Sequence, residues 1–259
     1  MSEERIDSIK ENMKTLFEQM FRKSKSESLR NIFREAFGSE YSEIANPDGF
    51  VTNTDLQNFA EHLKVGPGDR FIDLGCGRGG PGLLIARKTG ANYLGIDLSQ
   101  NAINQAKDRV KNFDISCNIE FKVGDISSLD YPDNSFNGAI SIDALIFVPN
   151  LPKTFLEISR ILQPKSILAF TAWEPKKYNE KRDFRSFLLN SGFDIKIYEV
   201  VKDWERRQRE VYEKTLQQKK TLIKDMGRDG AFAWIMDAKT YLHGLKNNQR
   251  IYVVAKLKN

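Results

Sequence analysis

Side chains that bind metals or act as nucleophiles are scarce in this sequence. It has two histidines, His62 and His243, and two cysteines, Cys76 and Cys117. None of them lies in a Cys/His cluster with metal-ligand spacing, so we expect no metal site. Two isolated cysteines favour reduced thiols and a cytoplasmic protein over a disulfide framework.

Long apolar runs and a dominant sign of charge are also missing. No apolar run approaches the roughly 18 residues of a membrane-spanning helix, and the N-terminal sequence MSEERIDSIKENMK lacks the apolar core of a secretory signal. The 40 Lys and Arg residues nearly balance the 35 Asp and Glu residues, which leaves a net charge of +5. Because the signs are interleaved, we expect neither a membrane nor a nucleic-acid partner.

Apolar residues are plentiful, at 40% of the 259 residues, and allow a sizeable core. The spacing of Ile6, Ile9, Met13 and Leu16 predicts helix within residues 1–37, and Thr54 is predicted to cap a helix ending near residue 63. Strand-like and helical patterns then alternate. The predicted strands are 71–74, 92–97, 118–123, 136–143 and 166–173, and the predicted helices are 81–89, 99–112 and 153–162.

The last third of the chain is less regular. It shows helical patterns at 180–191, 205–226 and 231–246 and strand patterns at 194–201 and 250–257. Strands that alternate with helices of this length predict an α/β fold with a doubly wound, mostly parallel sheet.

The glycine-rich stretch FIDLGCGRGG, residues 71–80, stands at the end of the first predicted strand. Glycine costs backbone entropy, so four in ten residues indicate close approach of the backbone to a ligand. In a doubly wound sheet the turn after the first strand is a binding place, and the N-terminus of the next helix favours an anionic or polar group there.

Two motifs fit this turn. Gly75, Gly77 and Gly80 match the G-x-G-x-x-G pattern of dinucleotide-binding proteins, which by itself is a weak signal. Asp73, Gly75, Gly77 and Gly79 instead form D-x-G-x-G-x-G, which resembles motif I of the class I S-adenosylmethionine-dependent methyltransferases. A carboxylate at Asp73 would repel a diphosphate and attract the ammonium of a methionine moiety, so it favours the second interpretation.

The resemblance to this family covers about residues 50–175 and implies a Rossmann-like methyltransferase fold with seven strands. It implies that Asp97, with Leu98 beside it, holds the ribose hydroxyls of the cofactor, and that Asp125 and Ile126 bind adenine. Ser141 and Asp143 end the fourth strand, where the methionine side lies in the family. A single aspartate after a strand is as often a turn former or helix cap, but several at successive strand ends make chance a poor explanation.

What the sequence lacks also narrows the acceptor that the family resemblance implies. No NPPY-like tetrad follows the fourth strand, where the sequence is DALIF at 143–147, and there is no Pro-Cys pair. These absences disfavour base-amine and cytosine methylation and leave a small-molecule acceptor, methylated on O, N or C. The family resemblance suggests a lid at 1–45 and a methyltransferase domain at 46–259 with a helical cap insertion at 202–249.

The acceptor pocket is predicted from aromatic residues in these parts. No catalytic base is named, because His62 and His243 are the only histidines and Asp143 is better suited to a cofactor contact. The acceptor and the oligomeric state are left open. The candidate acceptor residues are Tyr41, Phe147, Trp173, Trp204, Tyr241 and His243, with Tyr212 and Trp234 as further aromatic candidates.

Two other functions stay open at this point. The chain could be an NAD-dependent oxidoreductase that uses Gly75, Gly77, Gly80 and Asp97, because such enzymes also place an acid near the ribose. It could also bind the cofactor without catalysis, since no general base is evident.

Overall fold

The computed structural model describes residues 3–22, 26–177 and 182–259. One seven-stranded sheet has the strand order β3-β2-β1-β4-β5-β7-β6. Neighbours from β3 to β5 are parallel, whereas β7 is antiparallel to both β5 and β6. The strands are β1 (Arg70–Leu74), β2 (Asn92–Asp97), β3 (Ile119–Val123), β4 (Phe136–Ile142), β5 (Leu162–Pro175), β6 (Phe193–Val200) and β7 (Asn248–Leu257).

The predicted fold class is confirmed, and the strand order explains where a site can form. The chain moves outward from β1 through β2 to β3, then returns to the other side of β1 with β4. The crevice beyond the carboxyl ends of β1 and β4 is therefore the switch point at which ligands bind in such sheets.

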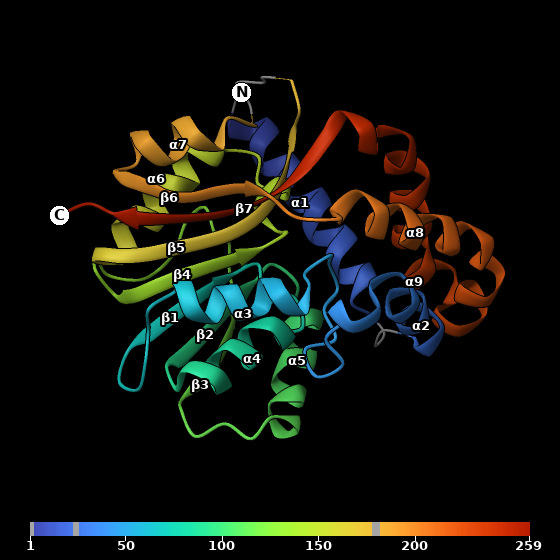
Figure 1. The fold of residues 1–259 in the computed structure, drawn as a ribbon, viewed down its shortest axis with the longest axis horizontal. Helices are drawn as coiled ribbons and strands as arrows, with labels where there is room; N and C mark the ends of the chain where they lie inside the picture. The colour runs from blue at the N-terminus through green and yellow to red at the C-terminus, as the bar shows by residue number, and fades with distance from the viewer. Residues whose placement is uncertain (1–2, 23–25, 178–181) are drawn as a thin grey trace.

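Helices cover both faces of the sheet (Figure 1). Alternation along the strands supplies both cores: Phe71 and Tyr93 face one helical layer, whereas Ile72 and Leu94 face the other. One layer contains α3 (Asn53–His62), α4 (Gly80–Thr89) and α5 (Gln100–Arg109), and the other contains α6 (Leu151–Ile161) and α7 (Phe184–Asn190).

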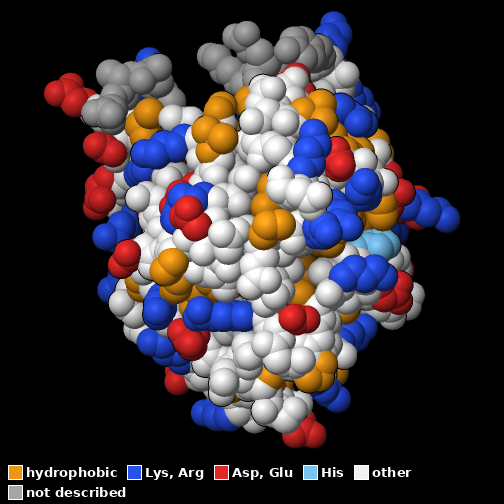
Figure 2. Space-filling view, turned by 90° about the vertical axis from the view of Figure 1, so that its left-hand side faces the viewer, with side chains coloured by type: hydrophobic (Ala, Val, Ile, Leu, Met, Phe, Trp, Pro, Cys, Tyr) orange, Lys and Arg blue, Asp and Glu red, His pale blue; other side chains and the backbone are white. Residues whose placement is uncertain are grey.

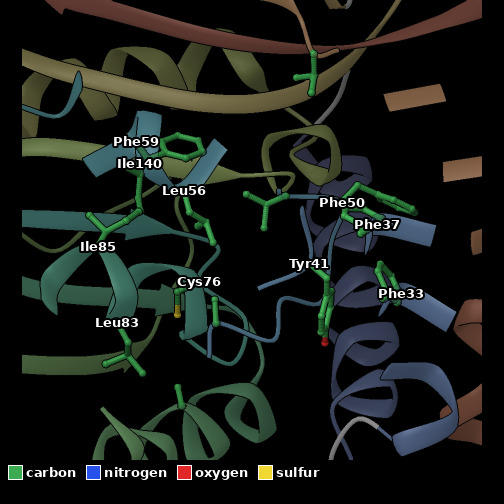
Figure 3. Close-up of a cluster of buried hydrophobic side chains, with 14 of the residues drawn as sticks. Phe33, Phe37, Tyr41, Phe50, Leu56, Phe59, Cys76, Leu83, Ile85 and Ile140 are labelled. Atoms are coloured by element: carbon green, nitrogen blue, oxygen red, sulfur yellow. The ribbon is translucent and has the colours of Figure 1, made fainter. Parts of the chain in front are cut away.

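Four further helices gather at the carboxyl end of the parallel strands (Figure 1). Three of them bury side chains in the core of the α3–α5 face, and Figure 3 shows Phe33, Phe37 and Phe50 on the side of these helices. They are α1 (Glu3–Met20), α2 (Glu27–Phe37), α8 (Trp204–Gln217) and α9 (Lys219–Tyr241), with short 3-10 turns at Gly38–Glu40, Val110–Asn112, Leu145–Phe147 and Leu242–Asn247.

The N-terminal prediction of helix over residues 1–37 needs correction. The chain forms two helices there, because the Ser26 hydroxyl accepts from the Leu29 N–H and starts α2 as a separate helix. Residues 1–2 and 23–25 of the predicted span lie outside the described residues. Thr54 is not the cap of α3: the Thr52 hydroxyl accepts from the Asp55 N–H, and the Asp55 carboxylate accepts from the Thr52 N–H.

The late helices also differ from their predicted bounds. The predicted helix 205–226 breaks at Gln218, and α9 then runs through a non-helical Gly227 with φ of 76°, where two helical segments meet. A positive φ is readily adopted by glycine and interrupts the helix, so this kink lies at the gap that the sequence predicts between residues 226 and 231. The predicted helix 180–191 reduces to α7, capped by Asp183, and residues 180–181 lie outside the described residues.

The surface opposite the candidate site carries both signs of charge. Figure 2 shows Lys and Arg side chains interspersed with Asp and Glu and no continuous basic stripe on this face. Within residues 3–22, 26–177 and 182–259, no helix combines the length and apolar character needed to cross a membrane.

Candidate active site

A cavity of about 900 Å³ opens beyond the carboxyl ends of β1, β2, β4 and β5, beneath α1, α8 and α9. This volume is near the upper end of the range for small-molecule pockets, about 300–1,000 Å³. Its two ends differ in chemistry. The carboxylate end is formed by Asp73, Gly75, Gly77, Asp97 and Asp125, and the aromatic end by Phe50, Trp173, Tyr212, Trp234 and Asp237.

The loop after β1 brings bare backbone to the cavity. Gly75, Gly77 and Gly79 have φ of +80°, +52° and +71°, in the region that disfavours other residues. A Cβ on Gly75 would lie 2.4 Å from the Cβ of Ala144, and the Gly75 N–H donates to the Ile96 carbonyl at 2.8 Å. Gly75 and Gly77 line the cavity, whereas Gly79 does not.

Asp73 presents an unsatisfied oxygen at the carboxylate end. It is 2% exposed and lines the cavity; the Tyr93 hydroxyl donates to its Oδ2 at 3.2 Å, but its Oδ1 has no hydrogen-bond partner. Burial raises the pKa of Asp73 to about 7, against the hydrogen bond from Tyr93 and with a further contribution from the charge of Asp97. A buried, unpartnered carboxylate oxygen is costly and suits a ligand that donates a hydrogen bond.

Asp97, at the end of β2, ties the second strand to the glycine loop. Its Oδ2 accepts from the Gly77 N–H at 2.8 Å and its Oδ1 from the Ser99 N–H at 2.9 Å. Burial raises the pKa of Asp97, although these two backbone donors oppose the shift. A carboxylate has about four acceptor positions, so both oxygens can still accept from a ligand. Leu98 also lines the cavity.

Asp125 follows β3 and pairs with the helix that covers the site. The Lys10 Nζ of α1 lies 2.7 Å from its Oδ2, and the Ser127 N–H and hydroxyl each donate to its Oδ1 at 2.8 Å. Although burial opposes it, these donors hold the pKa of Asp125 below its usual value. The neighbouring Ile126 is buried and lines the same cavity.

Ser141 and Asp143, which the sequence predicts to contact the cofactor at the end of β4, form hydrogen bonds within the protein. The Ser141 hydroxyl donates to the Leu74 carbonyl at 2.8 Å, and Ser141 is buried and does not line the cavity. Asp143 does line it, but its carboxylate accepts from the Phe50 N–H at 3.0 Å and the Thr171 hydroxyl at 2.7 Å. These contacts occupy acceptor positions that the sequence assigned to a cofactor.

Asp143 also forms an ion pair with Arg250 of β7. The Arg250 Nε lies 3.1 Å from the Asp143 carboxylate and its Nη1 lies 2.9 Å from Asp55, and only 1% of its side chain is exposed. Burial lowers the pKa of Arg250, but the two carboxylates outweigh it and raise the pKa above its usual value. Its guanidinium also lies 5.6 Å from the ring centroid of Trp173, so it lies beside two residues that line the cavity, Asp143 and Trp173.

Three of the predicted acceptor residues line the cavity and three do not. Trp173 lies at the end of β5, Phe147 packs edge-on against Phe17 of α1 at 5.1 Å between centroids, and Tyr241 ends α9. The predictions for Tyr41, Trp204 and His243 need correction. Tyr41 and Trp204 are buried in the core, where the Tyr41 hydroxyl donates to Asn46 at 2.6 Å, and His243 is exposed; none of them lines the cavity (Figure 3 labels Tyr41).

Comparison with known proteins identifies the family. The model of a methyltransferase domain matches residues 66–227, more than half of the 259 residues. The chain belongs to this methyltransferase family. The family predicted from the glycine turn and its neighbouring acids is thereby confirmed.

The relatives of this chain differ in their named substrates. Phosphoethanolamine N-methyltransferase 1 of Arabidopsis thaliana is 31% identical over 170 residues, which is 64% of this chain but 34% of that protein, so the match spans about a third of the relative's length. Geranyl diphosphate C-methyltransferase from Streptomyces coelicolor A3(2), with S-adenosyl-L-homocysteine bound, has a TM-score of 0.68 at 12% identity over 96% of this chain and 98% of that one. The [4+2]-cyclase SpnF has a TM-score of 0.69 at 23% identity over 78% and 80%. These two likenesses show a shared fold.

The helix α1, whose apolar stripe is visible in the sequence, covers the cavity. Ile9, Met13 and Leu16 of this stripe line the cavity, and so does the neighbouring Phe17. The Glu18 carboxylate fastens the helix to the start of α5, because it accepts from the Gln100 N–H at 2.5 Å and the Asn101 N–H at 3.2 Å. A carboxylate at a helix N-terminus satisfies N–H groups that have no partner within the helix.

Sequence reasoning missed several residues in and around the candidate site. Lys10 and Arg250 form ion pairs with Asp125 and Asp143. Asp237 lines the cavity and, among the described residues, has no ion-pair partner. Phe50 and Gln208 each contact both Trp173 and Tyr212. No motif marks them, because each is an ordinary residue of a helix, strand or loop. The alternating charge pattern around Gln208 indicated only a solvated helix.

Proposed function

We propose that this protein transfers a methyl group from S-adenosylmethionine to a small-molecule acceptor. Membership of the methyltransferase family supports the reaction class. The observation that carries the cofactor assignment is the buried Asp73, which lines the cavity beside a glycine loop and has one carboxylate oxygen without a partner. An ammonium group, such as that of the methionine moiety, is the donor that such an oxygen attracts.

The residues at the carboxylate end fit this cofactor. Asp73 would accept from its ammonium, and the backbone of Gly75 and Gly77 leaves room for the methionine chain. Asp97 retains acceptor positions for two ribose hydroxyls. Leu98, Asp125 and Ile126 would surround the adenine, with Asp125 as acceptor for its amine in exchange for part of its contact with Lys10.

S-adenosylmethionine supplies, when bound, a methyl group on a positively charged sulfur that leaves as a neutral thioether. The protein contributes alignment and exclusion of water. The apolar face of α1, with Met13 and Phe17, covers the cavity and supports the proposal that residues 1–45 act as a lid. Residues 202–249, which lie between β6 and β7, would form the cap over the acceptor. A cytoplasmic location and the lack of a nucleic-acid partner stay predictions.

The environment of Asp73 disfavours the dinucleotide alternative. A diphosphate in the glycine loop would stand beside two buried carboxylates, Asp73 and Asp97, and among the described residues no cation pairs with Asp73. Formation of a methylated product would distinguish the proposed enzyme from a protein that binds the cofactor without catalysis.

The test is titration calorimetry of the purified protein with S-adenosylhomocysteine and, separately, with NADH. We expect S-adenosylhomocysteine to bind with micromolar or lower Kd and NADH to bind at least a hundredfold more weakly. Tight binding of NADH alone would refute the assignment. Transfer of a labelled methyl group, screened over amines, phenols and carboxylic acids, distinguishes an enzyme from a protein that only binds the cofactor.

A further inference from the structure

Four side chains at the aromatic end form a directed chain of hydrogen bonds. The Trp173 Nε1–H donates to Gln208 Oε1 at 2.9 Å, and the Gln208 Nε2 donates to the Tyr212 hydroxyl at 2.7 Å. The Tyr212 hydroxyl donates in turn to Asp237 Oδ2 at 2.8 Å. The chain joins β5, α8 and α9, and all four residues line the cavity.

The direction of this chain follows from the chemistry of its first member. An indole N–H can only donate, so it fixes the carbonyl oxygen of the Gln208 amide toward Trp173 and the amide nitrogen toward Tyr212. The Tyr212 hydroxyl then accepts from Gln208 and directs its own proton to Asp237. Each donor therefore favours a negatively charged, well-oriented carboxylate at the end of the chain.

A hydrogen bond and no ion pair holds Asp237 in the part of the chain that the structure describes. None of the ion pairs found among the described residues includes Asp237, and no hydrogen bond to its Oδ1 is seen there. Burial raises the pKa of Asp237, against the hydrogen bond from Tyr212. Placing an unpaired acid at a partly buried position costs stability, so the arrangement suggests a role toward a ligand.

The rings around this carboxylate favour a positively charged ligand. Phe50 meets Trp173 and Tyr212 edge-on, each at 5.6 Å between ring centroids, and Trp234 lines the same part of the cavity. Aromatic faces attract cations, and the attraction grows when water is excluded. A hydroxyl acceptor would gain from the carboxylate but would gain nothing from the cation-binding character of the rings.

We propose that the acceptor is an amine and that Asp237 binds its ammonium group and takes its proton. This proposal rests on the proposed methyl transfer and names its substrate class and its base. The chain Trp173–Gln208–Tyr212 orients the Asp237 carboxylate, and these three residues are positioning residues for it.

The proton transfer balances at these atoms. The N–H bond of the ammonium breaks, the proton forms an O–H bond at Asp237, and the electron pair stays on nitrogen as the lone pair that accepts the methyl group. The methylated amine carries a positive charge again, and Asp237 returns to its starting state when it loses the proton to water. No oxidant, reductant or metal is required.

The first experiment uses the wild-type protein without cofactor. Quenching of the fluorescence of Trp173 and Trp234 is titrated with matched pairs of amines and alcohols of equal size: ethanolamine and ethylene glycol, benzylamine and benzyl alcohol, 2-phenylethylamine and 2-phenylethanol. We expect at least one amine to bind at least tenfold more tightly than its alcohol partner. Equal affinity in every pair, or no binding of any amine, overturns the proposal.

The second experiment compares Asp237→Asn with Asp229→Asn. Both residues lie on α9, but Asp229 is 70% exposed and outside the cavity, so it is a matched control. Asp237→Asn should abolish the preference for amines, while Asp229→Asn keeps it. The same preference in Asp237→Asn contradicts the assignment of Asp237, and the wild-type titration still decides the substrate class if that variant does not fold.

Binding of S-adenosylhomocysteine separates this proposal from the one on which it rests. Wild type and Asp237→Asn should bind it within twofold of each other, since Asp237 lies at the other end of the cavity. Failure of the wild type to bind it would refute the proposed function while leaving the amine preference measurable. Methyl transfer to the alcohols and not to the amines would refute the amine proposal alone.

Discussion

The two ends of the cavity are built in different ways. The carboxylate end takes its residues from three neighbouring strands, each at the point where the strand ends, and all lie between residues 73 and 125. The aromatic end takes Phe50 from a loop, Trp173 from β5, and Tyr212, Trp234 and Asp237 from α8 and α9. The first end is therefore fixed by the sheet, and the second depends on how helices pack.

This difference implies a division of labour. A rigid sheet edge suits a cofactor that is the same in every turnover, whereas packed helices can vary their lining with little effect on the sheet. The relatives fit this view, since a phosphoethanolamine N-methyltransferase and a geranyl diphosphate C-methyltransferase are named for different acceptors. Four changes test the comparison.

The largest effect is expected at Arg250, which pairs with Asp143 and lies beside Trp173, two residues that line the cavity. Arg250→Met should lower the free energy of unfolding by about 3–5 kcal/mol, because it leaves buried Asp55 and Asp143 without their cation. Urea unfolding followed by circular dichroism measures the loss. Arg87→Met, at an exposed position of α4, is the control and should change stability by less than about 0.5 kcal/mol. A similar small change at Arg250 would mean that the buried network contributes little.

The next effect is expected at the carboxylate end alone. Asp97→Ala should weaken S-adenosylhomocysteine binding by about ten- to a hundredfold, as expected for loss of charge-assisted hydrogen bonds worth about 1.5–3 kcal/mol. Its affinity for amines should stay unchanged if the two ends are independent. Calorimetry with each ligand checks both statements, and Asp108→Ala, on the exposed side of α5, is the matched control. Unaltered cofactor binding in folded Asp97→Ala would contradict the site.

A tenfold effect is expected from pH at Asp73. Its pKa is raised to about 7 by burial, so its negative form is disfavoured in the folded protein and stability falls as pH rises from about 4 through 7. An ammonium ligand needs that negative form. Cofactor affinity should therefore rise about tenfold between pH 6 and pH 8. Calorimetry at both pH values measures this, and a dependence of the same size in Asp73→Asn would assign it to another group.

The smallest effect is expected where α1 meets the carboxylate end. Lys10→Met removes an ion pair whose side chains are 26% and 30% exposed, so stability should fall by only about 0.2–1 kcal/mol. The pKa of Asp125 should rise toward its usual value, because Lys10 is one of the donors that hold it down. Thermal unfolding at low and high salt checks the first statement, since screening by salt should abolish the difference between wild type and variant.

The sheet and the carboxylate end were largely predictable from the residues. Short apolar segments, which predict strands, alternate with segments of helical periodicity. Because the carboxyl ends of parallel strands meet at one edge of the sheet, Asp73, Asp97 and Asp125 are expected to lie close together. Boundaries set by caps were less visible: Ser26 and Thr52 start helices that the apolar pattern alone merges or displaces. Asp143 shows the limit of strand-end reasoning, since its partner Arg250 lies 107 residues away along the chain.

The sequence by itself determined where strands and helices alternate, where the glycine turn lies and which acids flank it. These features depend on the local spacing of apolar residues and on backbone conformation. Only the tertiary structure decided which acid keeps a free oxygen and which is consumed by an ion pair. It also decided that Tyr41 and Trp204 belong to the core while Tyr212 and Asp237 face the cavity. Hydrogen bonds and burial at those positions join segments far apart in the chain, and no local pattern encodes such a meeting.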